Sequence, residues 1–364
     1  MPLYPVPSPL PYAKPGTVIS ARPFTSGSAL SNASNTLVVY HTSSATGRDV
    51  AVSGVISIPK GKPPAAGWPV ISWAHGTTGN APQCAPSRFA TPNVEQRFLN
   101  DWVDAGYAVV QTDYEGEGTP GLHPYFANAA GAHDTIDIVH AARAIDPQIG
   151  ERWVVMGHSE GGTIALFAAE IAPSWAPDLQ LLGAVSYAPA ADITDVLGHI
   201  MTSSQPMRGL PLGMMMVEGI ASTDPAIDLN RILSPHGLAL LPQLQSACAG
   251  EMMNSPAWNA VAPNSLFQRD APVNRLIHDF AANEPLNLAI HVPLLLEQGT
   301  ADELVSPDIT SALHANLCAN GVPAELDTIA GANHDSVMAR TRENVKEWVA
   351  ARFAGARIVR QTCR

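Results

Sequence analysis

Apolar residues lie along the chain in short runs that polar and glycine-rich turns separate. Runs of about four to eight such residues between turn signals are typical of buried strands. They predict strands at residues 36–41, 49–58, 68–75, 107–112, 153–156, 182–187, 292–298 and 324–329. Helical patterns predict helices at residues 92–105, 131–145, 163–170, 306–320 and 340–353. This alternation indicates an α/β protein with a mostly parallel central sheet and helices on both faces.

Two stretches depart from this alternation. The many prolines of residues 1–25 predict an extended arm on the surface, because proline does not fit inside a helix. Residues 190–287 show helical pieces and prolines but no clear strand. We therefore expect a core made of residues 1–189 and 288–364, with an inserted helical cap at 190–287.

The cap holds seven of the ten methionines, at positions 201, 207, 214, 215, 216, 252 and 253. Methionine is flexible and suits surfaces that accept varied apolar partners. One interpretation is an acyl-binding lid in which Met214 and Met215 contact the substrate. The alternative is a plain helical core packed with methionine.

Composition and charge limit the class of protein. A hydrophobic fraction of 46% suffices for a real core, while the net charge of −12 and the near absence of lysine argue against nucleic-acid binding. No apolar run approaches the roughly 18 residues that a transmembrane helix needs. The first residues lack the charged and apolar regions of a signal peptide. We expect a monomer.

Four cysteines, Cys84, Cys248, Cys318 and Cys363, are spread widely and form no C-x-x-C pair. An even number in a proline-rich, lysine-poor chain favours disulfides and export, to the periplasm or the medium. The alternative is four buried thiols. Spacing alone leaves three disulfide connectivities open.

The strongest motif is Gly157-His-Ser-Glu-Gly161, between a predicted strand and a predicted helix. This arrangement is typical of a nucleophile elbow, in which a tight turn holds Ser159 in a strained backbone conformation. A Cβ at either glycine would crowd the neighbouring strand or helix. The alternative is an ordinary glycine-rich turn.

A second turn, His75-Gly-Thr-Thr-Gly79, follows a buried strand upstream of the elbow, where an oxyanion-hole loop is expected. We predict that the N–H of Thr77 or of Thr78 pairs with the N–H of Glu160 to bind a developing oxyanion. The pattern does not choose between the two threonines. The Glu160 side chain is expected to be a polar anchor.

The loop of residues 113–125 is polar and glycine-rich, and we expect it beside the site, with Tyr114 near the substrate. Asp113, Glu115 and Glu117 could suggest a metal, but their spacing is not that of a calcium-binding loop. We interpret them as hydrogen-bonding anchors and predict no metal site.

Two further residues complete a catalytic arrangement. Asp302 follows a predicted strand in the turn Gly299-Thr-Ala-Asp302, and His334 follows the last predicted strand. The order Ser159, Asp302, His334 is that of the α/β-hydrolase fold. Ser159 would attack an acyl carbonyl, His334 would transfer its proton, and Asp302 would fix the imidazole tautomer. This chemistry needs no cofactor.

Several stretches resemble one family, the secretory lipases of the α/β-hydrolase superfamily, which includes Candida antarctica lipase A. The resemblance spans nearly the whole chain, and Ala168–Leu179 is its most specific part. The similar stretches are Trp73–Gly79, Cys84–Ser87, Thr112–Gly116, Gly157–Gly162, Ala168–Leu179, Gly299–Asp302 and Asn333–His334.

This resemblance implies that Ser159, Asp302 and His334 are the triad and that the insertion is a helical lid. It also implies the disulfide pairs Cys84–Cys248 and Cys318–Cys363. Glu160 stands where the fungal members have glycine, so interfacial activation and a long-chain preference are not implied.

The sequence thus predicts a secreted serine esterase or lipase that acts on small-molecule or lipid esters through an acyl-enzyme. An esterase for bulkier esters (feruloyl, acetylated-drug or polyester) is the nearest alternative, and a peptidase of the same fold is weaker. A hydrolase-fold protein that only binds its ligand is the alternative from another class.

Overall fold

The computed structural model describes residues 3–356 and Cys363. Within them a nine-stranded sheet has the order β1-β2-β3-β5-β4-β6-β7-β8-β9. Neighbours from β1 to β5 in this order pair antiparallel, and those from β5 to β9 pair parallel. The strands are β1 (Val18–Pro23), β2 (Ala33–Ser43), β3 (Asp49–Pro59), β4 (Trp68–Ala74), β5 (Ala108–Thr112), β6 (Ile149–His158), β7 (Gln180–Tyr187), β8 (Leu294–Gly299) and β9 (Ala324–Ile329).

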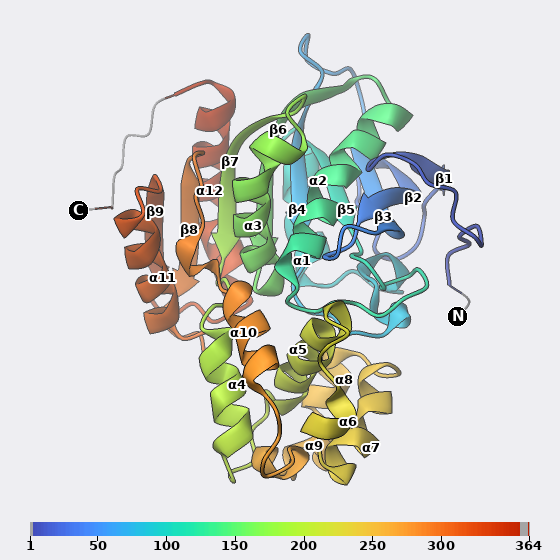
Figure 1. Cartoon of the computed structure of the whole chain (residues 1–364). Coiled ribbons are helices and arrows are strands. Elements are labelled where there is room, and N and C mark those ends of the chain that lie inside the picture. The colour runs from blue at the N-terminus through green and yellow to red at the C-terminus, as the bar shows by residue number, and fades with distance from the viewer. Residues whose placement is uncertain (1–2, 357–362, 364) are drawn as a thin grey trace.

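Five helices cover the two faces of the sheet (Figure 1). They are α1 (Val94–Asp104), α2 (Asn128–Ile145), α3 (Glu160–Trp175), α11 (Pro307–Ala319) and α12 (Ser336–Phe353). Buried side chains of α2, α3 and α11 form one hydrophobic cluster with the strands, and those of α1 and α12 form another with the opposite face. The expected three-layer α/β architecture is confirmed.

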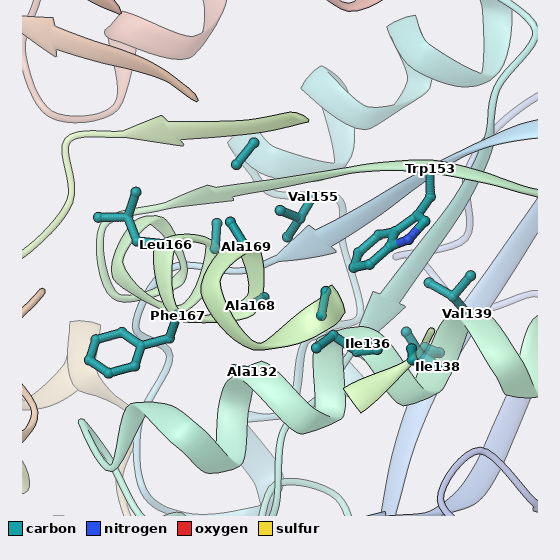
Figure 2. Packing of buried hydrophobic residues seen from close by; sticks show 14 of the residues in the cluster. Ala132, Ile136, Ile138, Val139, Trp153, Val155, Leu166, Phe167, Ala168 and Ala169 are labelled. Carbon is teal, nitrogen blue, oxygen red and sulfur yellow. The ribbon is translucent and has the colours of Figure 1, made fainter. Parts of the chain in front are cut away.

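Strand β6 shows why its sequence is continuously apolar. Trp153 and Val155 point to the α2–α3 side, as Figure 2 shows, while Val154 and Met156 belong to the cluster on the opposite face. Side chains alternate along a strand, and a parallel strand at the centre of a sheet is covered on both sides. Both sets of positions must therefore be apolar.

The predicted elements occur within a few residues of their expected positions. Helix α1 begins at Val94 because Asn93 caps it: the Asn93 side chain accepts from the N–H of Gln96, whose side chain accepts from the N–H of Asn93. The N-terminal arm contains a strand that the proline pattern did not predict, since β1 pairs antiparallel with β2 at the edge of the sheet.

A helical segment separates β7 from β8 and lies at one end of the sheet (Figure 1). It contains α4 (Ile193–Thr202), α5 (Leu210–Thr223), α6 (Leu229–Ile232), α7 (Pro235–Leu244), α8 (Ala249–Met253), α9 (Pro256–Asn259) and α10 (Asn274–Ala282). Its buried side chains form a hydrophobic cluster of their own, which also includes Tyr125 and Phe126. Short 3-10 turns lie at Pro82–Cys84, Pro86–Arg88, Pro263–Leu266 and Pro285–Asn287.

The insertion is fastened where it leaves and rejoins the sheet. The Glu284 carboxylate accepts from the N–H groups of Asp192 and Thr194, at 2.9 and 2.8 Å, which joins the start of the insertion to its end. Asn128, at the start of α2, donates two hydrogen bonds to Asn283, one to its side-chain oxygen and one to its backbone carbonyl. None of the helices described is long and apolar enough to span a membrane.

Candidate active site

The elbow follows β6 directly. His158 ends the strand, Glu160 begins α3, and Ser159 between them has φ 58° and ψ −118°. A positive φ is strained for serine and places its side chain at the head of the helix. The Ser159 N–H donates to the Tyr187 carbonyl of β7 at 2.9 Å, which holds the turn against the neighbouring strand.

The two glycines of the motif are required by close backbone approach. A Cβ at Gly157 would lie 2.0 Å from the carbonyl oxygen of Gly161, and a Cβ at Gly161 would lie 2.0 Å from that of Ala74. The elbow can therefore pack against β4 only when both positions lack a side chain.

Asp302 and His334 meet beyond the ends of β8 and β9. His334 Nδ1 lies 2.8 Å from Asp302 Oδ2, and the N–H groups of Leu304 and Val305 each donate to Oδ1 at 2.9 Å. Burial alone would raise the pKa of Asp302, but the hydrogen bond and charge of His334 and the two backbone donors together lower it. The carboxylate is thus held ionised beside the imidazole.

His334 is also attached to the elbow. Nε2 of His158, the residue before Ser159, lies 2.9 Å from the carbonyl oxygen of His334, and the two ring centroids are 4.6 Å apart. Ser159 is 9% exposed, and its hydroxyl makes no hydrogen bond within the described part of the chain. Contacts between a nucleophile and its base often tighten only when a substrate binds.

The loop after β4 lies beside the elbow and carries both predicted threonines. Neither the Thr77 N–H nor the Thr78 N–H donates to another backbone group in the described part of the chain. Their hydroxyls are occupied: that of Thr77 lies 2.7 Å from the Tyr125 hydroxyl, and that of Thr78 donates to Glu117. Both backbone donors stay available, so the geometry does not choose between them.

Glu95 of α1 anchors this loop, and the sequence analysis missed it. Its buried carboxylate accepts from the N–H of Gly76 at 2.8 Å and from the Trp73 indole at 3.2 Å, and lies 3.6 Å from His158 Nδ1. Burial raises its pKa, but the contact with His158 and the Gly76 N–H outweigh this effect and lower it. A glutamate on the apolar side of a predicted amphipathic helix was the available signal.

The prediction that Tyr114 contacts the substrate is wrong for this structure. Tyr114 is fully buried, its hydroxyl donates to the His75 carbonyl at 3.0 Å, and its ring stacks on the His75 imidazole at a centroid distance of 4.1 Å. The Tyr114 side chain supports the loop after β4 from the interior of the protein. Its φ of 65° lies in the left-handed region, which residues other than glycine rarely adopt.

Met214 and Met215 are also buried away from any substrate in this conformation. Both are 0% exposed and belong to the hydrophobic cluster of the insertion. The structure thus favours the alternative of a helical core packed with methionine for this pair.

Two disulfides join distant parts of the chain, in the pairing that the family resemblance implies. Cys84 is joined to Cys248 across 164 residues, and Cys318 to Cys363 across 45. The first links the loop after β4 to the insertion, where the Ala249 N–H also donates to the Thr78 carbonyl at 2.8 Å. The position of the loop after β4 therefore depends on the insertion.

In the polar loop after β5, the side chains of Asp113 and Glu117 are hydrogen-bonding anchors, as expected, whereas Glu115 contributes through its backbone N–H. Asp113 accepts from the N–H and hydroxyl of Ser87 and from the hydroxyl of Ser53. The Glu117 carboxyl group accepts a hydrogen bond from the Thr78 hydroxyl, and the N–H of Glu115 donates to Asp134. These contacts tie the loop to β3 and to the segment around Cys84.

Comparison with known proteins gives a family match. The family model described as secretory lipase matches residues 85–361. A probable inactive lipase of Mycobacterium tuberculosis is 24% identical over 97% of this chain and 82% of its own length. A secreted triacylglycerol lipase of Malassezia furfur is 22% identical over 75% of this chain and 53% of its own length.

Solved structures show the same fold. Candida antarctica lipase A superposes with a TM-score of 0.81 at 17% identity, covering 97% of this chain and 85% of that one. A rice cell wall degrading esterase of Xanthomonas oryzae gives a TM-score of 0.75 at 21% identity, covering 94% and 98%. The chain has the α/β-hydrolase fold.

Proposed function

We propose that this chain, which belongs to the secretory lipase family, is a serine hydrolase of carboxylic esters with Ser159, His334 and Asp302 as its triad. Family and fold together support a lipase or esterase. The finer assignment is carried by the Asp302–His334 contact of 2.8 Å, since His334 also contacts His158, which directly precedes Ser159 with its φ of 58°.

The contact with Asp302 defines which nitrogen of His334 acts as the base. Because Nδ1 faces a carboxylate, it carries the proton, and Nε2 keeps its lone pair for the Ser159 hydroxyl. Ser159 Oγ attacks the ester carbonyl while His334 takes the serine proton, and His334 then returns that proton to the leaving alkoxide. A water molecule hydrolyses the acyl-enzyme by the same route.

The developing oxyanion is bound by backbone donors. The Glu160 N–H belongs to the first turn of α3, whose N–H groups have no partner inside the helix. The second donor is the N–H of Thr77 or of Thr78, since both are available. Two preorganised donors of this kind account for several kcal/mol of transition-state stabilisation, roughly 3–4 kcal/mol per donor.

We also propose that residues 1–189 and 288–364 are the catalytic core and that residues 190–287 are a cap over its site. The separate hydrophobic cluster of the insertion supports this division, as do its links to the oxyanion loop. The two disulfides and the family match fit an extracellular location.

Hydrolysis of p-nitrophenyl esters from acetyl to palmitoyl tests the proposal, with the variant Ser159→Ala beside the parent chain. We expect turnover by the parent and a loss of about 10⁴-fold or more in the variant. A maximum at short acyl chains defines an esterase, and a maximum at long chains defines a lipase. Turnover that survives in Ser159→Ala would refute the triad.

Labelling with a fluorophosphonate separates an enzyme from a protein that only binds its ligand. One relative is described as a probable inactive lipase, which makes this alternative worth testing. Stoichiometric labelling of the parent, absent in Ser159→Ala, supports an activated serine. A parent that neither labels nor turns over any ester is a binding protein.

A further inference from the structure

Behind the elbow, the side chain of Glu160 is tied to a buried histidine. Glu160 is 1% exposed, and its Oε1 lies 2.9 Å from Nε2 of His123, which is 3% exposed. The other ring nitrogen of His123, Nδ1, lies 3.0 Å from the carbonyl oxygen of Glu115. A carbonyl only accepts, so Nδ1 carries a proton and Nε2 meets the Glu160 carboxyl group.

This geometry places a hydrogen bond between two buried side chains, and it joins the start of α3 to the loop after β5. A hydrogen bond between buried polar groups is strong because water does not compete for it. Glu160, the residue after the proposed nucleophile Ser159, is thereby held in place by its own side chain.

The loop that carries the second proposed donor, Thr77 or Thr78, is tied to the same buried region. The Thr78 hydroxyl donates to Glu117, with 3.1 and 3.2 Å to its two carboxyl oxygens, and Glu117 is fully buried. Burial, together with the nearby charges of Glu160 and Asp113, raises the pKa of Glu117 well above its ordinary value. The Thr78 hydroxyl is thus held by a carboxyl group that lies in the interior of the protein.

Stacked rings connect the two anchors. The Tyr114 ring lies between the imidazoles of His75 and His123, with centroid distances of 4.1 and 5.6 Å. His75 Nε2 lies 3.6 Å from Glu117, so this stack runs from the Glu117 anchor to the Glu160 anchor. A displacement of Glu117 or of Glu160 would therefore be opposed by the close packing of the rings between them.

We propose that His123 and Glu117 are positioning residues: His123 holds Glu160, Glu117 holds Thr78, and one buried polar network fixes both halves of the oxyanion hole. This inference rests on the proposed function, because it assigns a role to the loop on which the oxyanion forms. Neither side chain touches the reacting atoms. Each acts on the angle at which a backbone N–H points into the site.

The test uses the variants His123→Gln and Thr78→Val in the full chain with its disulfides intact. We expect kcat for a p-nitrophenyl ester to fall about 10- to 100-fold in each, with KM within about two-fold of the parent, because hydrogen bonds in the transition state are lost while ground-state binding persists. Thr78→Ser keeps the hydroxyl and should recover most of the loss.

A second readout reports the oxyanion hole itself. In a thionoester, sulfur replaces the carbonyl oxygen and accepts hydrogen bonds poorly, so an ordered hole favours the oxygen ester. We expect this preference to fall in His123→Gln and Thr78→Val. A general loss of stability would leave the ratio of the two rates unchanged.

His41→Gln is the matched control. His41 is 5% exposed and lies 2.8 Å from the partly exposed Asp49, in another histidine–carboxylate pair, at the antiparallel end of the sheet. It should keep kcat and the ester preference of the parent. If His41→Gln loses as much kcat as His123→Gln, stability explains the effect and the inference is wrong.

The remaining outcomes decide the two proposals separately. Parent turnover that depends on Ser159, with folded His123→Gln and Thr78→Val both within about two-fold of parental kcat, overturns the positioning network alone. If His123→Gln does not fold, Thr78→Val and Thr78→Ser decide by the same criteria. A parent without Ser159-dependent turnover overturns both the function and the network.

Discussion

Glu297 of β8 is a buried acid whose ionisation should make the stability of the protein depend on pH. It is 0% exposed, and neither of its carboxyl oxygens has a hydrogen-bond partner among the described residues. Burial first, and then the charges of Asp327 and Glu325, raise its pKa from 4.5 to about 9. The folded protein therefore keeps this proton at neutral pH, whereas the unfolded chain has released it.

The magnitude follows from that difference. A raised pKa means that the contribution of Glu297 is complete below pH 4.5 and is lost as the pH rises toward 9. Each pH unit between these values amounts to about 1.4 kcal/mol. At pH 7, roughly 2.5 units above 4.5, ionisation of the unfolded chain has lowered the free energy of unfolding by about 3 kcal/mol.

The variant Glu297→Gln removes this effect, because an amide has the size of a protonated carboxyl group and does not ionise. We expect it to match the parent near pH 4 and to exceed it by about 3 kcal/mol at pH 7. For a chain of 364 residues, whose unfolding entropy is about 2.1 cal/mol/K per residue, that gain raises Tm by roughly 4 °C. Thermal unfolding from pH 4 to 8 measures the difference, with the exposed Glu303→Gln as the control.

Two results would refute the reasoning. An equal gain at pH 4 and pH 7 would mean that packing, not ionisation, separates the variant from the parent. A variant no more stable than the parent at pH 7 would mean that Glu297 is ionised and solvated in the folded protein. The Glu303→Gln control should keep the Tm of the parent at both pH values. A change in Tm seen only in Glu297→Gln then belongs to position 297.

Three other changes should have distinct effects. Replacing Cys84 and Cys248 by serine opens a link across 164 residues and should lower the free energy of unfolding by up to about 5 kcal/mol, measured in urea with and without reductant. Asp302→Asn should reduce kcat about 10³- to 10⁴-fold while the fold is retained by circular dichroism, and a loss below about ten-fold would count against its role. Gly161→Ala places a Cβ 2.0 Å from a backbone oxygen of β4 and should cost about 3 kcal/mol or prevent folding, whereas Gly198→Ala in α4 meets nothing within 4 Å and should be neutral or stabilising in thermal unfolding.

The framework of the fold could be predicted because local pattern and tertiary environment agree. The β6 run is apolar at every position since both its faces are covered, and the turn after it requires glycine, because a Cβ there would lie 2.0 Å from a backbone oxygen. Strand β1 could not be predicted in this way. It lies at the exposed edge of the sheet, where few side chains need to be apolar, and its pairing with β2 is a long-range contact.

Side-chain partners at the site were harder to predict than positions along the chain. Order and turns suffice to propose that Asp302 and His334 meet, because strand ends converge at one edge of a parallel sheet. The Glu160–His123 pair and the Glu95 anchor depend on how loops fold over that edge. Tyr114 was misassigned for the same reason: a tyrosine in a polar loop is expected at the surface, but its own loop and the loop after β4 fold together and bury it.

The Cys84–Cys248 link has a consequence for how the molecule withstands proteases outside a cell. A single cut anywhere between residues 85 and 247, a span that includes the elbow and most of the helical insertion, leaves two fragments that are still covalently joined. On a denaturing gel such a nicked protein keeps its full mass until reductant is added. A cut between residues 249 and 317 lies outside both closed loops and yields two separate bands without reductant. Between the first and the last cysteine, the backbone from α8 to α11 is therefore the stretch in which one break divides the molecule.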